Sequence, residues 1–170
     1  MKKYLFVLLT ITLTTLNVNA QHKWGGCYIE QTTPNSNGLI WEDENVKFTF
    51  YPTDLFWSIT IENKSSGKFT CLWDDVLFII DKKSSKIVFD DTVRLKKDDP
   101  KGESVIASET EIRKEIYPVD LWWDSSIGGA QYIFKKRLIK KYGEMNIKLV
   151  FPLVSESGKT DYEFTFRVYI

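Results

Sequence analysis

Hydrophobic and polar residues alternate along most of this chain. Between positions 46 and 51, Val46, Phe48 and Phe50 alternate with Lys47 and Thr49, which places the apolar side chains on one face of an extended segment. The same period of two recurs later, and the pattern predicts strands over 46–51, 56–61, 69–73, 76–80, 87–89, 112–117, 145–153 and 162–168. Turn residues separate several of these strands, at 63–67, 84–85 and 98–102.

One segment departs from this alternation. In the sequence KKRLIKKY over 135–142, Leu138 and Tyr142 lie four positions apart, basic residues gather near the end, and Gly143 follows. These are features of a short helix that ends at a glycine. We therefore predict an all-β fold, an antiparallel immunoglobulin-like β-sandwich with Greek-key connections, about seven to nine strands and one short helix near 135–142.

The first twenty residues have the pattern of a removable export signal. Two lysines precede a mostly apolar stretch, Tyr4–Leu16, which is shorter than the roughly 20 residues that a permanent membrane-spanning helix needs. Short side chains then lead to Ala20, as signal peptidase requires. We predict a signal peptide over 1–20 that is cleaved after Ala20, and export to the periplasm or beyond. The alternative is that this stretch forms a first buried strand or helix.

Composition narrows the class of protein further. The chain has 170 residues, of which 43% are hydrophobic and 15% aromatic, so a disordered chain is excluded. Cleavage of the signal leaves residues 21–170, which is enough for a single domain. It also leaves 21 basic residues against 23 acidic ones, a balance that argues against nucleic acid as a partner. Beyond the signal, no stretch is long and apolar enough for a transmembrane segment.

Export also affects the interpretation of the two cysteines, Cys27 and Cys71. An oxidising compartment favours a disulfide bond between them. One alternative is a pair of unpaired thiols, with Cys71 filling the core. A second alternative is a lipid on Cys27, but ten residues separate this cysteine from the end of the apolar stretch at Leu16.

Several short segments, taken in order, resemble an uncharacterised family of small exported bacterial proteins and lipoproteins. These segments are Ile61–Ser65, Trp73–Asp75, Phe78–Asp81, Tyr117–Asp120, Lys141–Gly143 and Phe151–Leu153. The resemblance covers the chain from about Val46 to Val168. It implies an immunoglobulin-like sandwich at the cell envelope and no known activity, so it assigns a role to no residue. The lipoprotein members carry a cysteine at the start of the mature chain, which this chain lacks.

Catalytic motifs are scarce. The single histidine, His22, follows the predicted cleavage site closely, where chain ends usually fray, and the motifs GxSxG, HExxH and CxxC are absent. We expect no cofactor and no metal-dependent chemistry. Acidic clusters occur at Glu42–Glu44, Asp74–Asp75, Asp90–Asp91 and Asp98–Asp99. Aspartate favours turns, which is our interpretation of these clusters; a structural calcium ion or a catalytic carboxylate pair are the alternatives.

Two adjacent tryptophans, Trp122 and Trp123, are flanked by Asp120 and Asp124. Neighbouring residues of a strand face opposite ways, so one ring packs inward while the other is exposed or covered by the following glycine-rich loop. An exposed ring beside an acidic residue suits a sugar or a protein partner. Structural packing against that loop is the alternative.

The helical segment is strongly basic. Its cations, at Lys135, Lys136, Arg137, Lys140 and Lys141, suit an anionic lipid or polysaccharide surface, or form a solvated face without a partner.

These observations predict a non-enzymatic exported protein that binds a protein or another cell-surface component at the envelope. The first alternative is a carbohydrate-binding module that uses an exposed tryptophan, Trp122 or Trp123. The second is a small hydrolase in which carboxylates such as Asp120 and Asp124 converge in a cleft.

Overall fold

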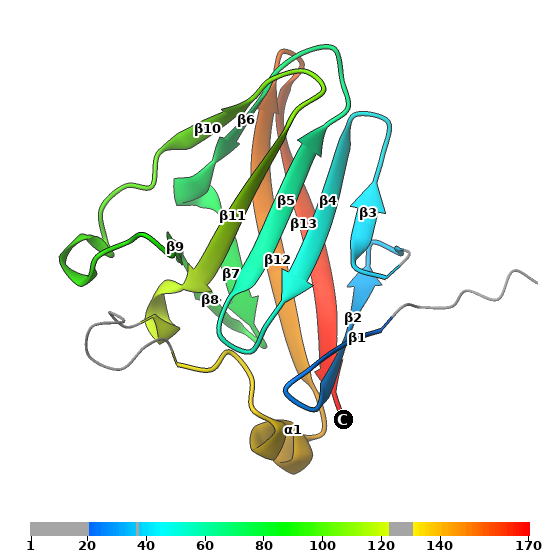
Figure 1. Ribbon diagram of the computed structural model, residues 1–170, viewed down its shortest axis with the longest axis vertical. Helices are drawn as coiled ribbons and strands as arrows, with labels where there is room; N and C mark the ends of the chain where they lie inside the picture. The colour runs from blue at the N-terminus through cyan, green and yellow to red at the C-terminus, as the bar shows by residue number, and fades with distance from the viewer. Residues whose placement is uncertain (1–20, 37, 123–130) are drawn as a thin grey trace, which may run out of the picture.

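The computed structural model describes residues 21–36, 38–122 and 131–170. Within them the chain forms two antiparallel β-sheets that pack face to face, which confirms the predicted all-β sandwich (Figure 1). The immunoglobulin-like Greek-key topology stays a prediction. The predicted signal peptide over 1–20, together with Trp123 and Asp124, lies outside the described residues.

The larger sheet has eight strands, arranged around the long hairpin of β12 and β13. In spatial order they are β1 (His22–Trp24), β2 (Cys27–Thr33), β13 (Gly158–Tyr169), β12 (Met145–Ser155), β6 (Phe69–Leu72) and β10 (Glu103–Ile106), with β7 (Leu77–Ile80) and β8 (Lys83–Ser85) beside the first half of β12. β12 pairs with β7 along its first half and with β6 near its end.

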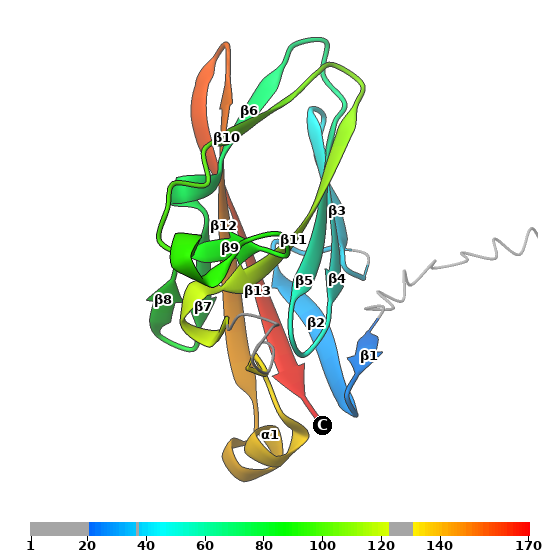
Figure 2. The same ribbon diagram turned by 60° about the vertical axis from the view of Figure 1, so that its left-hand side comes forward.

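The smaller sheet has five strands. In order they are β3 (Ile40–Glu42), β4 (Val46–Pro52), β5 (Trp57–Asn63), β11 (Glu111–Pro118) and β9 (Ile87–Phe89). Short 3₁₀ turns connect some of the strands: η1 (Trp73–Asp75), η2 (Arg94–Lys96) and η3 (Val119–Leu121). The turned view in Figure 2 shows the two sheets as separate layers, with β11 crossing in front of β5.

Aromatic rings from both sheets form the centre of the core. Phe48 and Phe50 of β4 meet Phe164 of β13 at centroid distances of 4.7 and 4.8 Å, and Trp57 of β5 meets Phe166 at 4.7 Å. All five rings lie at inward-facing positions of strands in which hydrophobic and polar residues alternate. The period of two therefore explains which side chains are buried. Such rings contribute strongly to stability because each buries a large apolar area.

The predicted helix is present as α1 (Lys136–Tyr142). Its residue Ile139 is buried in the core, whereas the basic residues around it are exposed. Gly143 ends the helix with a φ of 95°, a conformation that glycine adopts most readily, and its N–H donates to the carbonyl of Ile139 at 2.8 Å.

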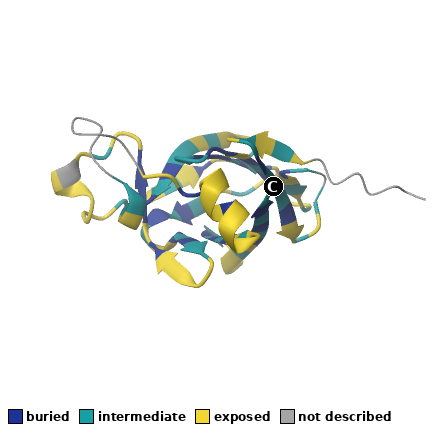
Figure 3. Ribbon diagram, turned by 90° about the horizontal axis from the view of Figure 1, so that it is seen from below, coloured by how far each residue is buried: buried dark blue, intermediate teal, exposed yellow. Residues whose placement is uncertain are grey.

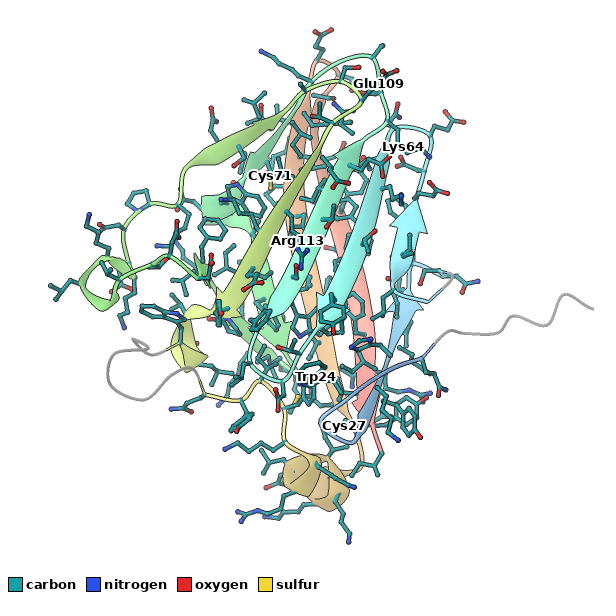
Figure 4. All side chains as sticks on the ribbon, viewed as in Figure 1. Trp24, Cys27, Lys64, Cys71, Glu109 and Arg113 are labelled. Carbon is teal, nitrogen blue, oxygen red and sulfur yellow. The ribbon has the colours of Figure 1, made fainter. Side chains whose placement is uncertain are left out.

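The sandwich has two distinct ends. We call the end that carries α1 and the last residue of the chain the base, and the opposite end the upper end (Figure 1). The base includes the β4–β5 turn and η3. The upper end includes the turns that follow β5, β10 and β12, and Lys64 and Glu109 mark it in Figure 4.

The predicted disulfide bond is wrong, because Cys27 and Cys71 are both free and buried. Cys71 lies at the level of Leu153, which pairs with Thr160 at the start of β13. Cys27 begins β2, just past the level of Tyr169. Nine residue steps along β13 at about 3.3 Å each separate these levels by roughly 30 Å, so the thiols cannot bond.

Both thiols also have low reactivity, because burial raises their pKa values. Burial raises the pKa of Cys71 to about 12. Burial likewise raises the pKa of Cys27, although Lys136 opposes this effect. A protonated thiol is a poor nucleophile, so these side chains act as small apolar groups within the core.

Candidate functional site

A cavity of about 610 Å³ opens at the base of the sandwich, and we call it the basal cavity. The β7–β8 hairpin forms one wall, η3 forms another, and the segment that leads into α1 forms the third. Its apolar lining consists of Ile80, Pro118, Leu121, Tyr132, Ile133 and Leu138. A hollow that combines apolar walls with a few polar groups is the usual form of a small-molecule site.

The turn of the β7–β8 hairpin is fixed by Asp81. This residue has a φ of 54°, which aspartate tolerates better than most side chains. Its N–H donates to the carbonyl of Asn146 at 2.7 Å, and its carboxylate accepts the N–H of Asn146 at 3.0 Å. These two bonds hold the hairpin against the start of β12 and therefore keep the cavity wall in place.

Backbone bonds also hold the η3 wall. The N–H of Val119 donates to the carbonyl of Lys86 at 2.8 Å, and the N–H of Asp120 donates to the Ser85 hydroxyl at 3.3 Å. Gln131 and Leu121 are joined by a 2.7 Å bond from the Gln131 N–H to the Leu121 carbonyl. The wall is thus tied to β8 on one side and to the α1 segment on the other.

Three lysines stand at the rim of the basal cavity: Lys82, Lys83 and Lys135. All three are exposed, and the ion pairs of the described residues include none of them. The Lys135 ammonium lies 4.7 Å from the centre of the Tyr132 ring, which holds that charge over an apolar part of the lining. The lining also contains the carboxylates of Asp81 and Asp120, so three cations stand against two anions and the net charge of the lining is +1.

The structure brings together residues from two predicted groups. Asp120 and Lys135 both line the basal cavity. Trp122 is half-buried and lies outside that lining, while Trp123 and Asp124 lie outside the described residues. Lys136, Arg137, Lys140 and Lys141 are exposed on α1 and do not line the cavity.

Sequence reasoning did not identify Lys82, Lys83 and Tyr132 as site residues. It recognised Leu138 only as a helix feature, although this side chain lines the cavity. The one available signal was the pair of adjacent lysines after a strand. That signal is weak, because exposed hairpin turns are often basic without any function.

A second cavity, of about 360 Å³, lies beside η1 and shares Asp120 and Ser85 with the first. Its lining contains both acidic and basic side chains. The acidic ones are Asp74, Asp98, Asp99 and Asp120, and the basic ones are Lys86, Lys97 and Lys101. Asp74 accepts the N–H groups of Lys101 and Gly102 at 2.8 and 3.0 Å. This carboxylate therefore closes a loop, as expected for aspartate in turns.

A third cavity, of about 320 Å³, lies at the upper end among serines and Lys68. In the part of the chain that the structure describes, no group of three or more His, Cys, Asp or Glu side chains is placed to hold a metal ion.

His22 differs from its expected place at a frayed terminus. It belongs to β1, where its ring lies 5.1 Å from Tyr51 and 6.5 Å from Trp24. The Trp24 indole N–H donates to Asp54 at 2.9 Å, which fastens β1 to the β4–β5 turn. Burial lowers the pKa of His22, and a hydrogen bond with the backbone of Pro52 partly offsets this.

Comparisons of the chain with models of protein families, with curated proteins and with solved structures find no match. The helices within the described ranges all lack the length and hydropathy needed to cross a membrane.

Proposed function

We propose that this protein is an exported, non-enzymatic binding protein of the cell envelope that takes up an amphiphilic anion in the basal cavity. The ligand class is a molecule with an acyl-like chain and an acidic headgroup. The observation that carries the proposal is the combination of an apolar lining with a lysine rim in one cavity. We base export on the predicted signal peptide over 1–20. The immunoglobulin-like topology and the family resemblance are also part of this proposal.

The apolar lining provides the affinity for the chain. Each methylene group removed from water contributes about 0.8 kcal/mol, so six buried methylenes contribute roughly 5 kcal/mol before the cost of immobilising the ligand. A volume of about 610 Å³ accommodates such a chain. Since the walls are tied together by backbone bonds, the cavity exists before the ligand arrives, which lowers that cost.

The lysine rim selects the headgroup. Lys82 and Lys83 belong to the β7–β8 hairpin and Lys135 to the segment that leads into α1, so an acid at the mouth has cations available from two walls of the cavity. Attraction between opposite charges is stronger beside apolar walls than in bulk water. A neutral amphiphile gains only the apolar part of this interaction.

The two alternative functions depend on other residues. The carbohydrate-binding alternative needs an exposed tryptophan, and among the described residues Trp122 is half-buried. The hydrolase alternative needs carboxylates such as Asp120 and Asp124 to converge in a cleft; Asp124 lies outside the described residues, and the aspartates around the second cavity, Asp120 included, share its lining with three lysines. The basal cavity requires neither, which is why we favour ligand binding there.

Calorimetric titration tests this proposal with three probes: dodecanoate, the neutral dodecyl maltoside and acetate. Dodecanoate is expected to bind, dodecyl maltoside to bind more weakly, and acetate to show no binding. The substitution Leu138→Glu places a carboxylate at the mouth of the cavity and is expected to weaken dodecanoate binding at least about tenfold. The matched control is Leu95→Glu, because Leu95 is 96% exposed and lies outside the cavity.

The double variant Lys83→Ala/Lys135→Ala separates the contribution of the ligand's headgroup to binding from the contribution of its acyl chain. It is expected to weaken binding of dodecanoate while leaving dodecyl maltoside unchanged. The proposal is rejected if dodecanoate does not bind, or if the Leu138→Glu and Leu95→Glu variants bind it equally.

A further inference from the structure

The outer surface of α1 combines positive charge with exposed apolar side chains. Arg137, Lys140 and Lys141 of α1, together with Lys135 just before the helix, form what we call the basic face; Lys136 is also exposed, but its stem lies against Gly26 of the β1–β2 turn. They are exposed, and no ion pair of the described residues involves them. Figure 3 shows α1 from below, where it stands in front of the sandwich and is exposed along most of its length.

Apolar side chains border the basic face. Leu138 is 37% exposed and Tyr142 is 68% exposed; being four residues apart, they share one side of the helix. Tyr132, six residues before Leu138 in the chain, is 48% exposed. The Lys141 ammonium is 4.9 Å from the centre of the Tyr142 ring, so charge and apolar surface are directly adjacent.

The helix is anchored from the other side. Ile139 is buried in the core, and Gly26 allows the stem of Lys136 to lie close to the β1–β2 turn, where a Cβ on Gly26 would be 3.2 Å from that stem. α1 therefore cannot turn its apolar residues inward without losing Ile139. The exposed leucine and tyrosines form a stable feature of the surface.

From these observations we infer that the basic face docks on an anionic phospholipid surface, with α1 lying in the headgroup region. Tyrosine and leucine enter the interface at the depth where amphipathic helices are found, and the lysines and arginine meet the anionic headgroups. A soluble polysaccharide would satisfy the charges alone and leave Leu138 and Tyr142 in water. The apolar residues therefore favour a bilayer over a polysaccharide.

Vesicle flotation tests this inference with phosphatidylcholine alone and with added phosphatidylglycerol. The protein is expected to float only with the anionic vesicles, and to dissociate at high salt because the attraction is screened. Each basic residue near a charged surface contributes enough for roughly a fivefold change in binding, so Lys140→Ala/Lys141→Ala is expected to weaken binding about 25-fold. Tyr142→Ser is also expected to weaken binding to the vesicles, because it removes an apolar contact with the bilayer. Binding to the soluble polyanion dextran sulfate depends on charge alone and is expected not to require Tyr142.

The matched control is Lys68→Ala/Lys97→Ala, which removes the same charge from exposed positions away from α1. The inference is overturned if the protein fails to float with anionic vesicles, if the two double variants bind equally, or if Tyr142→Ser binds as the unmodified protein does. Lys140, Lys141 and Tyr142 do not line the basal cavity. Dodecanoate binding by these variants thus reports on the proposed function separately.

Discussion

The two ends of the sandwich use their polar groups in opposite ways. At the upper end, the buried side chain of Asn63 donates to the carbonyls of Gly67, Ile106 and Ala107 at 2.7, 3.0 and 3.0 Å, and its oxygen accepts the N–H and O–H of Ser65. At the base, the lysines of the cavity rim and of α1 make no ion pair within the described residues.

This difference separates stability from binding. A group whose hydrogen bonds are made within the protein has little left to offer a ligand, whereas an exposed cation beside apolar surface gains from one. The upper end therefore joins turns of different strands, and the base is where we propose that other molecules bind. Substitution of the buried side chain of Asn63 should change the free energy of unfolding, and substitutions of the exposed lysines at the base should chiefly change binding.

The largest expected effect on stability comes from Asn63→Leu. The leucine has a similar volume but removes the side-chain donor from the buried carbonyl of Ile106, whereas the carbonyls of Gly67 and Ala107 keep hydrogen bonds from Ser65 and Thr110. The loss is about 3 kcal/mol, because each unsatisfied buried group costs about 1–3 kcal/mol. Urea unfolding measures it. The control Ser157→Ala, also at the upper end but exposed, is expected to change stability by less than about 0.5 kcal/mol.

Binding measurements on the Asn63→Leu variant make this first prediction more specific. In conditions where Asn63→Leu is still folded, its affinity for dodecanoate and for anionic vesicles is expected to equal that of the unmodified protein. A loss of binding in proportion to the loss of stability would contradict the separation of the two ends.

A smaller effect is expected at the base from Gly143→Ala. Gly143 has a φ of 95°, so an alanine there is strained and is expected to cost about 1 kcal/mol. Gly67 at the upper end is the matched glycine, because it lacks a left-handed φ and a Cβ there would meet nothing within 4 Å. Urea unfolding of both variants checks the difference. Equal stability of Gly143→Ala and Gly67→Ala would show that the strain at the end of α1 is absent.

The long strands and the helix could be predicted from the sequence because their signals are local. β4, β5, β12 and β13 alternate over many residues, and α1 ends at the glycine that its sequence places there. The early and short strands carry weaker signals. In β2 the third inward position is Gln31, whose amide donates to the carbonyl of Pro34, and in β10 only Ile106 is buried.

The basal cavity could be predicted only in part. Asp120 and Lys135 were candidates on chemical grounds, but nothing local shows that they line one cavity. That arrangement depends on the pairing of β11 with β9, which brings Pro118 to Ile87, and of β7 with β12, which brings Ile80 to Ile147. The disulfide prediction failed for the same reason, since strand order places the two cysteines at different ends.

The smallest expected effect is a dependence of stability on pH that arises at the base. Burial lowers the pKa of His22, and its Nε2 atom has no hydrogen-bond partner among the described residues. In the unfolded chain this histidine takes its ordinary pKa of about 6.5 and therefore binds a proton that the folded protein excludes. Stability is thus full above the unfolded pKa and falls as the pH decreases toward the folded pKa.

The variant His22→Gln isolates this contribution, because His22 is the single histidine in the chain. Urea unfolding of both proteins between about pH 5 and pH 8 should show the unmodified protein losing stability relative to the variant on acidification. Asn63→Leu carries no titratable change, so its loss of stability should stay constant over the same range. A pH-independent difference between His22→Gln and the unmodified protein would mean that the packing of β1 on Tyr51 does not exclude the proton. The two ends would then no longer differ in how burial of a titratable group makes stability depend on pH.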